Sequence, residues 1–146
     1  MTRPDVSNRS LGVMLIVSWL ALLLFQPLTE AWDDRPSQRP WIDVSLQLDG
    51  DRVLYTRMIK RVLRGDWTAR VQISTGEGWR TVCDDSGAWT YRPETSGTLG
   101  MTFDRFTGGC PQPSGAHRVC VDYVMEDLRG RRRIFGPFCS EGTGGS

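Results

Sequence analysis

The stretch DWTARVQI, residues 66–73, decides the fold. Its odd-numbered positions are apolar and its even-numbered positions are polar, which is the pattern of a β-strand with one buried face. Alternating or short extended segments of the same kind occur at residues 41–48, 79–83, 88–91, 99–103, 119–125 and 134–138. Because strands spaced roughly every 8–12 residues are typical of antiparallel sandwiches, the sequence predicts an all-β domain.

Turns separate these segments. They are predicted at Asp49-Gly50, at residues 75–78, at residues 84–87 and around Gly130. The pattern resembles immunoglobulin- or fibronectin-like sandwiches in architecture, and such a resemblance implies a fold but not a function. We expect a single antiparallel β-sandwich over residues 41–140, followed by a flexible polar tail at residues 141–146.

Residues 52–64 fit two structures. As a strand, they return from the Asp49-Gly50 turn and extend to about Met58. As a helix, they would gather basic residues on one side and end at Gly65, which would suggest an element that docks on a membrane surface or a partner. The turn favours the strand.

The N-terminal segment from Ser10 to Thr29 contains no charged residue and is dominated by large apolar side chains. A helix of this length spans about 30 Å, the thickness of a bilayer's hydrocarbon core. We therefore predict a transmembrane anchor at residues 10–29, between a short cytoplasmic tail (1–9) and a linker (30–40) stiffened by two prolines. The alternative is a cleaved signal peptide, for which the only near match to a cleavage site ends at Ala31.

Charge predicts the orientation of this anchor. Arg3 and Arg9 precede it, whereas Glu30, Asp33 and Asp34 follow it before the next arginine. Since basic residues stay in the cytoplasm, the N-terminus is expected inside and the sandwich outside. The predicted location is a bacterial inner membrane, with one span and a periplasmic domain.

All four cysteines lie in the exported half of the chain: Cys83, Cys110, Cys120 and Cys139. An even number of cysteines in an oxidising compartment indicates disulfides, and no Cys-x-x-Cys motif points to redox or zinc chemistry. Among three possible pairings we favour Cys83–Cys110, which would pin a strand to a loop, and Cys120–Cys139, which would close a hairpin.

The sequence offers little catalytic chemistry. The one histidine, His117, has no recognisable nucleophile motif around it, and we expect it at a strand start on the surface. The acidic pairs Asp33-Asp34 and Asp84-Asp85 do not match a calcium loop. We predict no catalytic residue, no metal site and no cofactor. The formal net charge of +1 also argues against nucleic acid as a partner.

Two groups of residues are candidates for interaction. Trp79 and Trp89 flank the Cys83 segment and belong either to the core or to an exposed binding surface. The densest basic cluster is either a solvated hairpin tip or a contact for an anionic partner, and it consists of Arg129, Arg131, Arg132 and Arg133.

These observations predict a membrane-anchored, extracytoplasmic protein that is not an enzyme. Its expected role is an accessory, assembly or interaction subunit for a protein partner in or outside the membrane. The alternative is a secreted or anchored module that binds an envelope glycan or another small ligand through Trp79 or Trp89.

Overall fold

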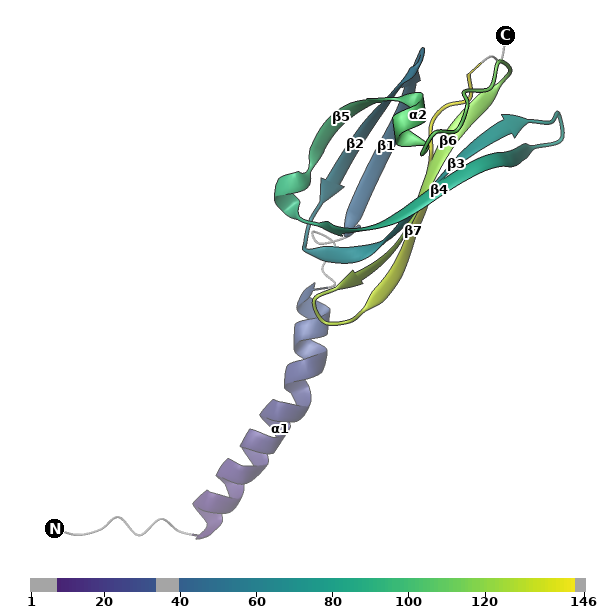
Figure 1. Cartoon of the computed structure of the whole chain (residues 1–146). Helices are drawn as coiled ribbons and strands as arrows, with labels where there is room; N and C mark the ends of the chain where they lie inside the picture. The colour runs from purple at the N-terminus through teal and green to yellow at the C-terminus, as the bar shows by residue number, and fades with distance from the viewer. Residues whose placement is uncertain (1–7, 34–39, 144–146) are drawn as a thin grey trace. The chain divides into compact units, whose positions relative to one another are not determined.

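The computed structural model describes residues 8–33 and 40–143 (Figure 1). The chain divides into two units, with the boundary between Arg39 and Pro40. The first unit contains one helix and the second unit contains the β-strands, and each is described by itself. The predicted tail at residues 1–9 and the predicted linker lie largely outside the described residues.

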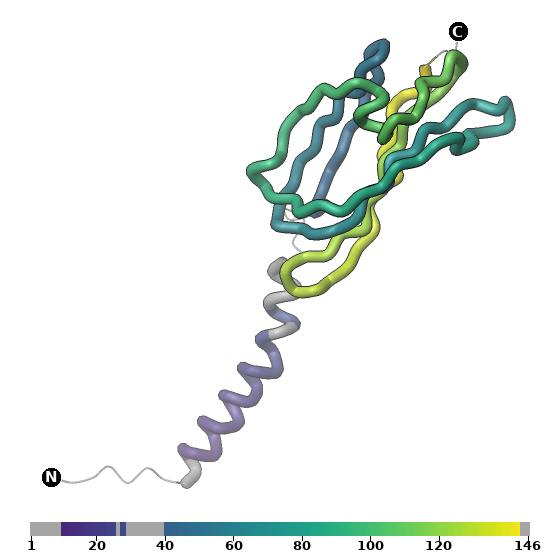
Figure 2. The backbone as a smooth tube through the Cα atoms, in the orientation of Figure 1, coloured from purple at the N-terminus to yellow at the C-terminus, as the bar shows by residue number. Residues whose placement is uncertain are grey.

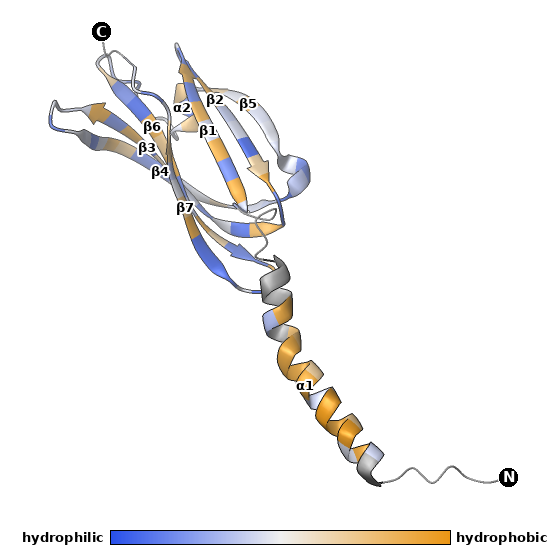
Figure 3. Ribbon diagram, turned by 180° about the vertical axis from the view of Figure 1, so that it is seen from behind, coloured by the Kyte–Doolittle hydropathy of each residue, from blue (hydrophilic) through white to orange (hydrophobic). Residues whose placement is uncertain are grey.

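The first unit is the helix α1 (Asn8–Asp33), which is apolar along most of its length (Figure 3). Its apolar side chains are exposed, among them Leu15, Trp19 and Phe25. The helix continues to Asp33, past Thr29, where the sequence predicted that it would end. Within the part of the chain that the structure describes, no helix is both long and apolar enough to cross a membrane. The anchor at residues 10–29 stays a prediction.

The second unit contains seven strands in two antiparallel sheets. Their bounds are β1 (Ile42–Asp49), β2 (Arg52–Ile59), β3 (Leu63–Ser74), β4 (Trp79–Tyr91), β5 (Gly97–Thr102), β6 (His117–Asp127) and β7 (Arg132–Cys139). Two short helices flank β5, namely η2 (Pro93–Thr95) and α2 (Phe103–Phe106). One sheet has the order β1-β2-β5 and the other the order β4-β3-β6-β7. This arrangement confirms the predicted all-β sandwich.

The Asp49-Gly50 turn explains why residues 52–59 form a strand and not a helix. Gly50 has a φ of 61°, which glycine adopts without steric cost, and Asp49 pairs with Arg52 across the turn. Val53 and Tyr55 then face the core while Arg52 and Thr56 face solvent. The strand prediction for this segment is confirmed.

The prediction of a turn at residues 84–87 is wrong, because β4 runs unbroken from Trp79 to Tyr91. The hairpin turn lies earlier, at residues 75–78, so β4 pairs along the whole of β3. Asp84 pairs with Arg70, and Gly87 pairs with Trp67, whose ring lies 3.0 Å from the position of a Cβ atom on Gly87. Pairing with a long neighbouring strand outweighs the local turn propensity of these residues.

The core lies between the two sheets and is filled from both inner faces. Trp41, Ile42, Leu63, Val71 and Met125 are among its fully buried members. Fully burying a large apolar side chain contributes roughly 1.5–3 kcal/mol, so the burial of this cluster strongly stabilises the domain.

The structure pairs Cys83 with Cys110 and Cys120 with Cys139, which confirms the predicted disulfides. The first links the edge strand β4 to the loop after α2, and the second joins paired residues of β6 and β7. Both bonds therefore involve strands of the four-stranded sheet.

Candidate functional site

The sandwich is open on one of its two sides. On the closed side, β1 packs against β6 and β7. On the other side the edge strands β4 and β5 diverge from the segment that connects them (Figure 2). Between them lies a cavity of about 280 Å³, lined by residues from β2, β3, β4, β5, β6 and α2. We call this cavity the inter-sheet cleft.

Trp89 and Leu99 stand at the mouth of the inter-sheet cleft. Trp89 lies on the same face of β4 as the buried Tyr91, yet it is 62% exposed, and Leu99 on β5 is 43% exposed. Both residues lie on edge strands, since β4 and β5 each end their sheet, and they line the same cavity. The ring of Trp67 forms part of the wall, where it covers Gly87.

The floor of the cleft carries three tyrosines. The hydroxyls of Tyr55 and Tyr123 are 2.6 Å apart and hydrogen-bonded, and the ring of Tyr91 meets that of Tyr123 edge-on at 5.8 Å. Burial, reinforced by the neighbouring Tyr55, raises the pKa of both Tyr91 and Tyr123 well above the ordinary tyrosine value. These hydroxyls are therefore protonated at neutral pH and can both donate and accept hydrogen bonds.

Two arginines line the same cleft, one toward each end of β5. Arg57 pairs with Gly97 at the start of β5, whereas Arg105 lies in α2, just after β5 ends. The Nε atom of Arg57 donates to the carbonyl of Thr95 at 2.9 Å, and its Cζ atom lies 5.5 Å from the ring centre of Tyr91.

No carboxylate balances the charge of the two arginines inside the cleft. In residues 40–143 no ion pair joins Arg57 or Arg105 to a carboxylate, and no aspartate or glutamate lines the cleft. The cleft therefore combines apolar walls with two positive charges, which suits an apolar group that carries an anion.

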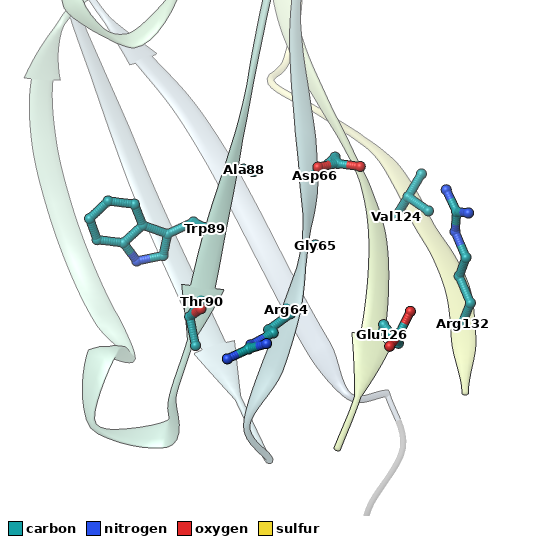
Figure 4. A pocket seen from close by; sticks show the side chains of 9 residues that line it. All are labelled: Arg64, Gly65, Asp66, Ala88, Trp89, Thr90, Val124, Glu126 and Arg132. Atoms are coloured by element: carbon teal, nitrogen blue, oxygen red, sulfur yellow. The ribbon is translucent and has the colours of Figure 1, made fainter. Parts of the chain in front are cut away.

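The outer face of β4-β3-β6-β7 holds a second, broader hollow of about 730 Å³ (Figure 4). Its charges alternate across the strands, since Arg64 pairs with Glu126 and Glu126 with Arg132. Trp89 lies beside this hollow, but its ring points away from the other labelled side chains (Figure 4). With charges of both signs on an open surface, this hollow selects no particular ligand.

The structure separates the two tryptophans that the sequence singled out. Trp79 starts β4 and is 38% exposed, with the Cζ atom of Arg118 4.4 Å from its ring centre. Trp89 lies near the other end of the same strand and lines the inter-sheet cleft. The two indoles therefore do not form one binding surface.

The basic cluster is in part a structural element of the β6–β7 turn. Arg131 donates two hydrogen bonds to Oδ2 of Asp127, at 2.8 and 2.7 Å, and Oδ1 of Asp127 accepts from the backbone N–H groups of Arg129 and Arg131. Arg131 and Arg133 also lie over the buried ring of Trp41, with Cζ atoms 5.5 and 4.8 Å from its centre. Arg132 faces the outer hollow.

Burial raises the pKa of the Asp127 carboxyl, but the hydrogen bonds from Arg131 and from the backbone of Arg129 and Arg131 outweigh this effect. The pKa therefore lies below its ordinary value. Asp127 is charged at neutral pH and holds the turn together.

His117 begins β6, as the sequence predicted, but it is buried and not on the surface. Its Nδ1 atom is 2.7 Å from the carbonyl of Gly115, and the ring meets Phe103 edge-on. The helix α2, which the sequence did not indicate, provides this cover. The predicted absence of a catalytic residue stays a prediction.

Among the described residues, no three His, Cys, Asp or Glu side chains lie close enough together to hold a metal ion. The predictions of no metal and no cofactor also remain predictions.

Sequence reasoning missed Tyr55, Tyr123, Arg57 and Arg105 as cleft residues. Tyr55 and Arg57 lie in the segment for which the helix was the alternative, and only the register of the strands brings Tyr55 beside Tyr123, 68 positions away. The alternation of Tyr123 with polar neighbours indicated a core position, which is correct, but not a position at a cleft.

Fold and site together define this chain as an all-β sandwich protein with one open side. Among solved structures it is similar to R. palustris CsgH, with 15% identity over 64% of this chain and 85% of that chain, at a TM-score of 0.32. At this identity and TM-score the likeness defines neither a shared family nor a function. No protein-family model matches the chain, and no curated protein does.

Proposed function

We propose that this protein is a membrane-tethered, non-enzymatic interaction subunit that binds a protein partner outside the membrane through the inter-sheet cleft. The observation that carries the proposal is the open side of the sandwich, where Trp89 lies on the inner face of its strand and is still 62% exposed. An exposed aromatic side chain beside an apolar cavity is typical of an interface anchor.

The tether and the fold assignment belong to the same proposal. The exposed apolar side chains of α1, such as Leu22 at 73% and Phe25 at 66%, favour insertion into a bilayer. Arg3 and Arg9 favour an N-in, C-out orientation in a bacterial inner membrane, with the sandwich in the periplasm. The strand order β1-β2-β5 and β4-β3-β6-β7 supports an immunoglobulin/fibronectin-like sandwich, in which the fourth strand has joined the second sheet.

A photo-crosslinking amino acid at position 89 tests the interaction role. In native membranes, the full-length protein with the probe at position 89 is expected to form one dominant, saturable adduct with an envelope protein. The same probe at position 79 is the matched control, because Trp79 starts the same strand and does not line the cleft. Equal adducts from both positions, or none from position 89, would refute the proposal.

The same preparation tests the tether. Mass spectrometry of the protein extracted from washed membranes is expected to show residues 1–29 still attached. A soluble protein cut near Ala31 would instead establish a secreted protein with a cleaved signal peptide.

The alternative function is the binding of an envelope glycan or another small ligand. The observation that favours it is the hydroxyl pair of Tyr55 and Tyr123 in a cavity that also contains exposed indole surface. Thermal shifts of the full-length protein with envelope glycan fragments test it. A saturable shift that Trp89→Ala abolishes and Trp79→Ala preserves would support this alternative over the protein partner.

A further inference from the structure

We infer that the partner binds as an extended strand alongside β5, with apolar side chains in the inter-sheet cleft and acidic side chains toward Arg57 and Arg105. This inference rests on the proposed function and specifies the chemistry of the partner at the same site.

The first observation is the unequal number of strands. One sheet has three strands and the other has four, and the edge strands β5 and β4 line the same cavity. A strand added beside β5 would lie opposite β4, because neighbouring strands are about 4.8 Å apart and packed sheets about 10 Å apart. Its inward side chains would then cover Trp89 and Leu99, which are exposed in the unbound domain.

The second observation is that β5 is an unprotected edge. Natural edge strands are usually protected against pairing by charged residues or proline. Three of the edge strands follow this rule, since β1 contains Asp43, β4 contains Asp84 and Asp85, and β7 contains Arg132 and Pro137. In contrast β5, with the sequence GTLGMT, contains no charged residue and no proline.

The backbone of β5 is also accessible. This strand pairs only with β2, so the backbone groups on its other edge have no strand partner in the described domain. Five of its six residues are exposed, with Met101 half-buried. An extended peptide can therefore form main-chain hydrogen bonds along it, as in other cases of strand addition.

The third observation is the charge of the cleft. Arg57 lies level with the start of β5 and Arg105 follows its end, with no carboxylate between them in the cleft. A strand with an acidic side chain toward each end would pair with both guanidinium groups. A partner strand of about seven residues would extend along the whole of the six-residue β5, since a strand rises about 3.3 Å per residue.

The test uses the full-length protein in nanodiscs and the blocked peptide ETVTVTE, which places glutamates and valines on one face. The matched control is KTVTVTK, which has the same shape and the opposite charge. We expect ETVTVTE to bind saturably and to slow amide hydrogen exchange in residues 97–102. We expect KTVTVTK to bind at least about tenfold more weakly.

Variants connect binding to the cleft. The double variant Arg57→Gln/Arg105→Gln is expected to weaken the binding of ETVTVTE at least about tenfold. The binding of KTVTVTK is expected to become no weaker. The control variant Arg64→Gln/Arg132→Gln removes two arginines from the outer face and is expected to change neither. Unchanged exchange in residues 40–50 would show that the double variant is folded.

Other outcomes overturn the inference. If decanoate binds while the amide hydrogen exchange of β5 stays unchanged and ETVTVTE does not bind, that result would assign the cleft to a small amphiphile. Protection of β5 in a dimer without peptide would assign it to a second copy of this chain. No protection of β5 by ETVTVTE, together with a specific adduct from position 89, would refute the strand and keep the proposed interaction role.

Discussion

At the scale of single residues, Asp127 and the pair Tyr55 and Tyr123 are buried polar groups that have hydrogen-bond partners. Asp127 accepts hydrogen bonds from both the backbone and the side chain of its own turn, while Tyr55 and Tyr123 satisfy one another. A buried polar group that loses its partner costs about 1–3 kcal/mol, so each of these pairs gives a measurable prediction.

Asp127→Asn is expected to lower the free energy of unfolding at pH 7 by about 1–3 kcal/mol, because Arg131 loses its charged partner. The native pKa of Asp127 lies below the unfolded value of about 3.9, so its stabilisation is complete above that pH and is lost as pH falls through the native pKa. Urea unfolding should show that the difference in free energy of unfolding between variant and wild type is smaller near pH 3 than at pH 7. Glu126→Gln is the control, because Glu126 is exposed; a pH-independent gap would contradict this account.

Tyr55→Phe and Tyr123→Phe are each expected to lower the free energy of unfolding by about 1–2 kcal/mol, since each leaves one buried hydroxyl without its partner. The double variant should cost clearly less than the sum of the two, because no unpaired hydroxyl remains. Denaturant unfolding of the four proteins in the cycle measures the coupling. Strict additivity would show that the two hydroxyls do not depend on each other.

At the scale of elements, the central strand β3 is held tightly against β6. A Cβ atom on Gly65 would overlap the carbonyl oxygen of Val124 and lie 2.8 Å from Cα of Met125. Backbone atoms cannot move aside as side chains do, so this glycine fixes the spacing of the two strands.

Gly65→Ala is therefore expected to destabilise the domain by more than about 2 kcal/mol. Gly78→Ala is the control, because Gly78 has an ordinary φ and nothing within 4 Å of its Cβ position. Thermal unfolding of both variants measures the difference. Similar midpoints would mean that β3 and β6 can separate without cost.

The two disulfides are expected to act on different elements. Replacing both cysteines of either pair by alanine should lower the free energy of unfolding by about 2–4 kcal/mol. Loss of Cys83–Cys110 should also accelerate hydrogen exchange in β4, because that bond secures an edge strand to a loop, whereas Cys120–Cys139 joins two strands that are already paired. Exchange rates of residues 79–91 in each double variant test this difference. Equal acceleration in both would contradict it.

At the scale of the whole molecule, the chain divides into two units, and the sandwich contains its own core and both disulfides. A chain that begins at Pro40 is therefore expected to fold with a thermal midpoint within about 2–4 °C of the full-length protein. Because it lacks α1, the proposed tether, this shorter chain should also be absent from the membrane fraction. Calorimetry and membrane fractionation measure the two properties, and an unfolded product would show that α1 contributes to the fold.

The sequence by itself determined most of the strands and the β1–β2 hairpin, and it favoured the disulfide pairing that the structure has. Period-two alternation is a local property, and the cysteines were few enough for spacing to favour one pairing. The local signal failed at residues 84–87, where pairing with β3 outweighed turn propensity, and at His117, which α2 and its neighbours bury.

Only the tertiary structure decided which side of the sandwich is open. The cleft depends on which strands are edges and on the register that brings Tyr55 beside Tyr123 and Arg57 level with the start of β5. Those relations join residues far apart in the chain, so no local pattern encodes them. The exposure of Trp89 follows from the same cause, because an inward-facing side chain is buried only if a strand faces it.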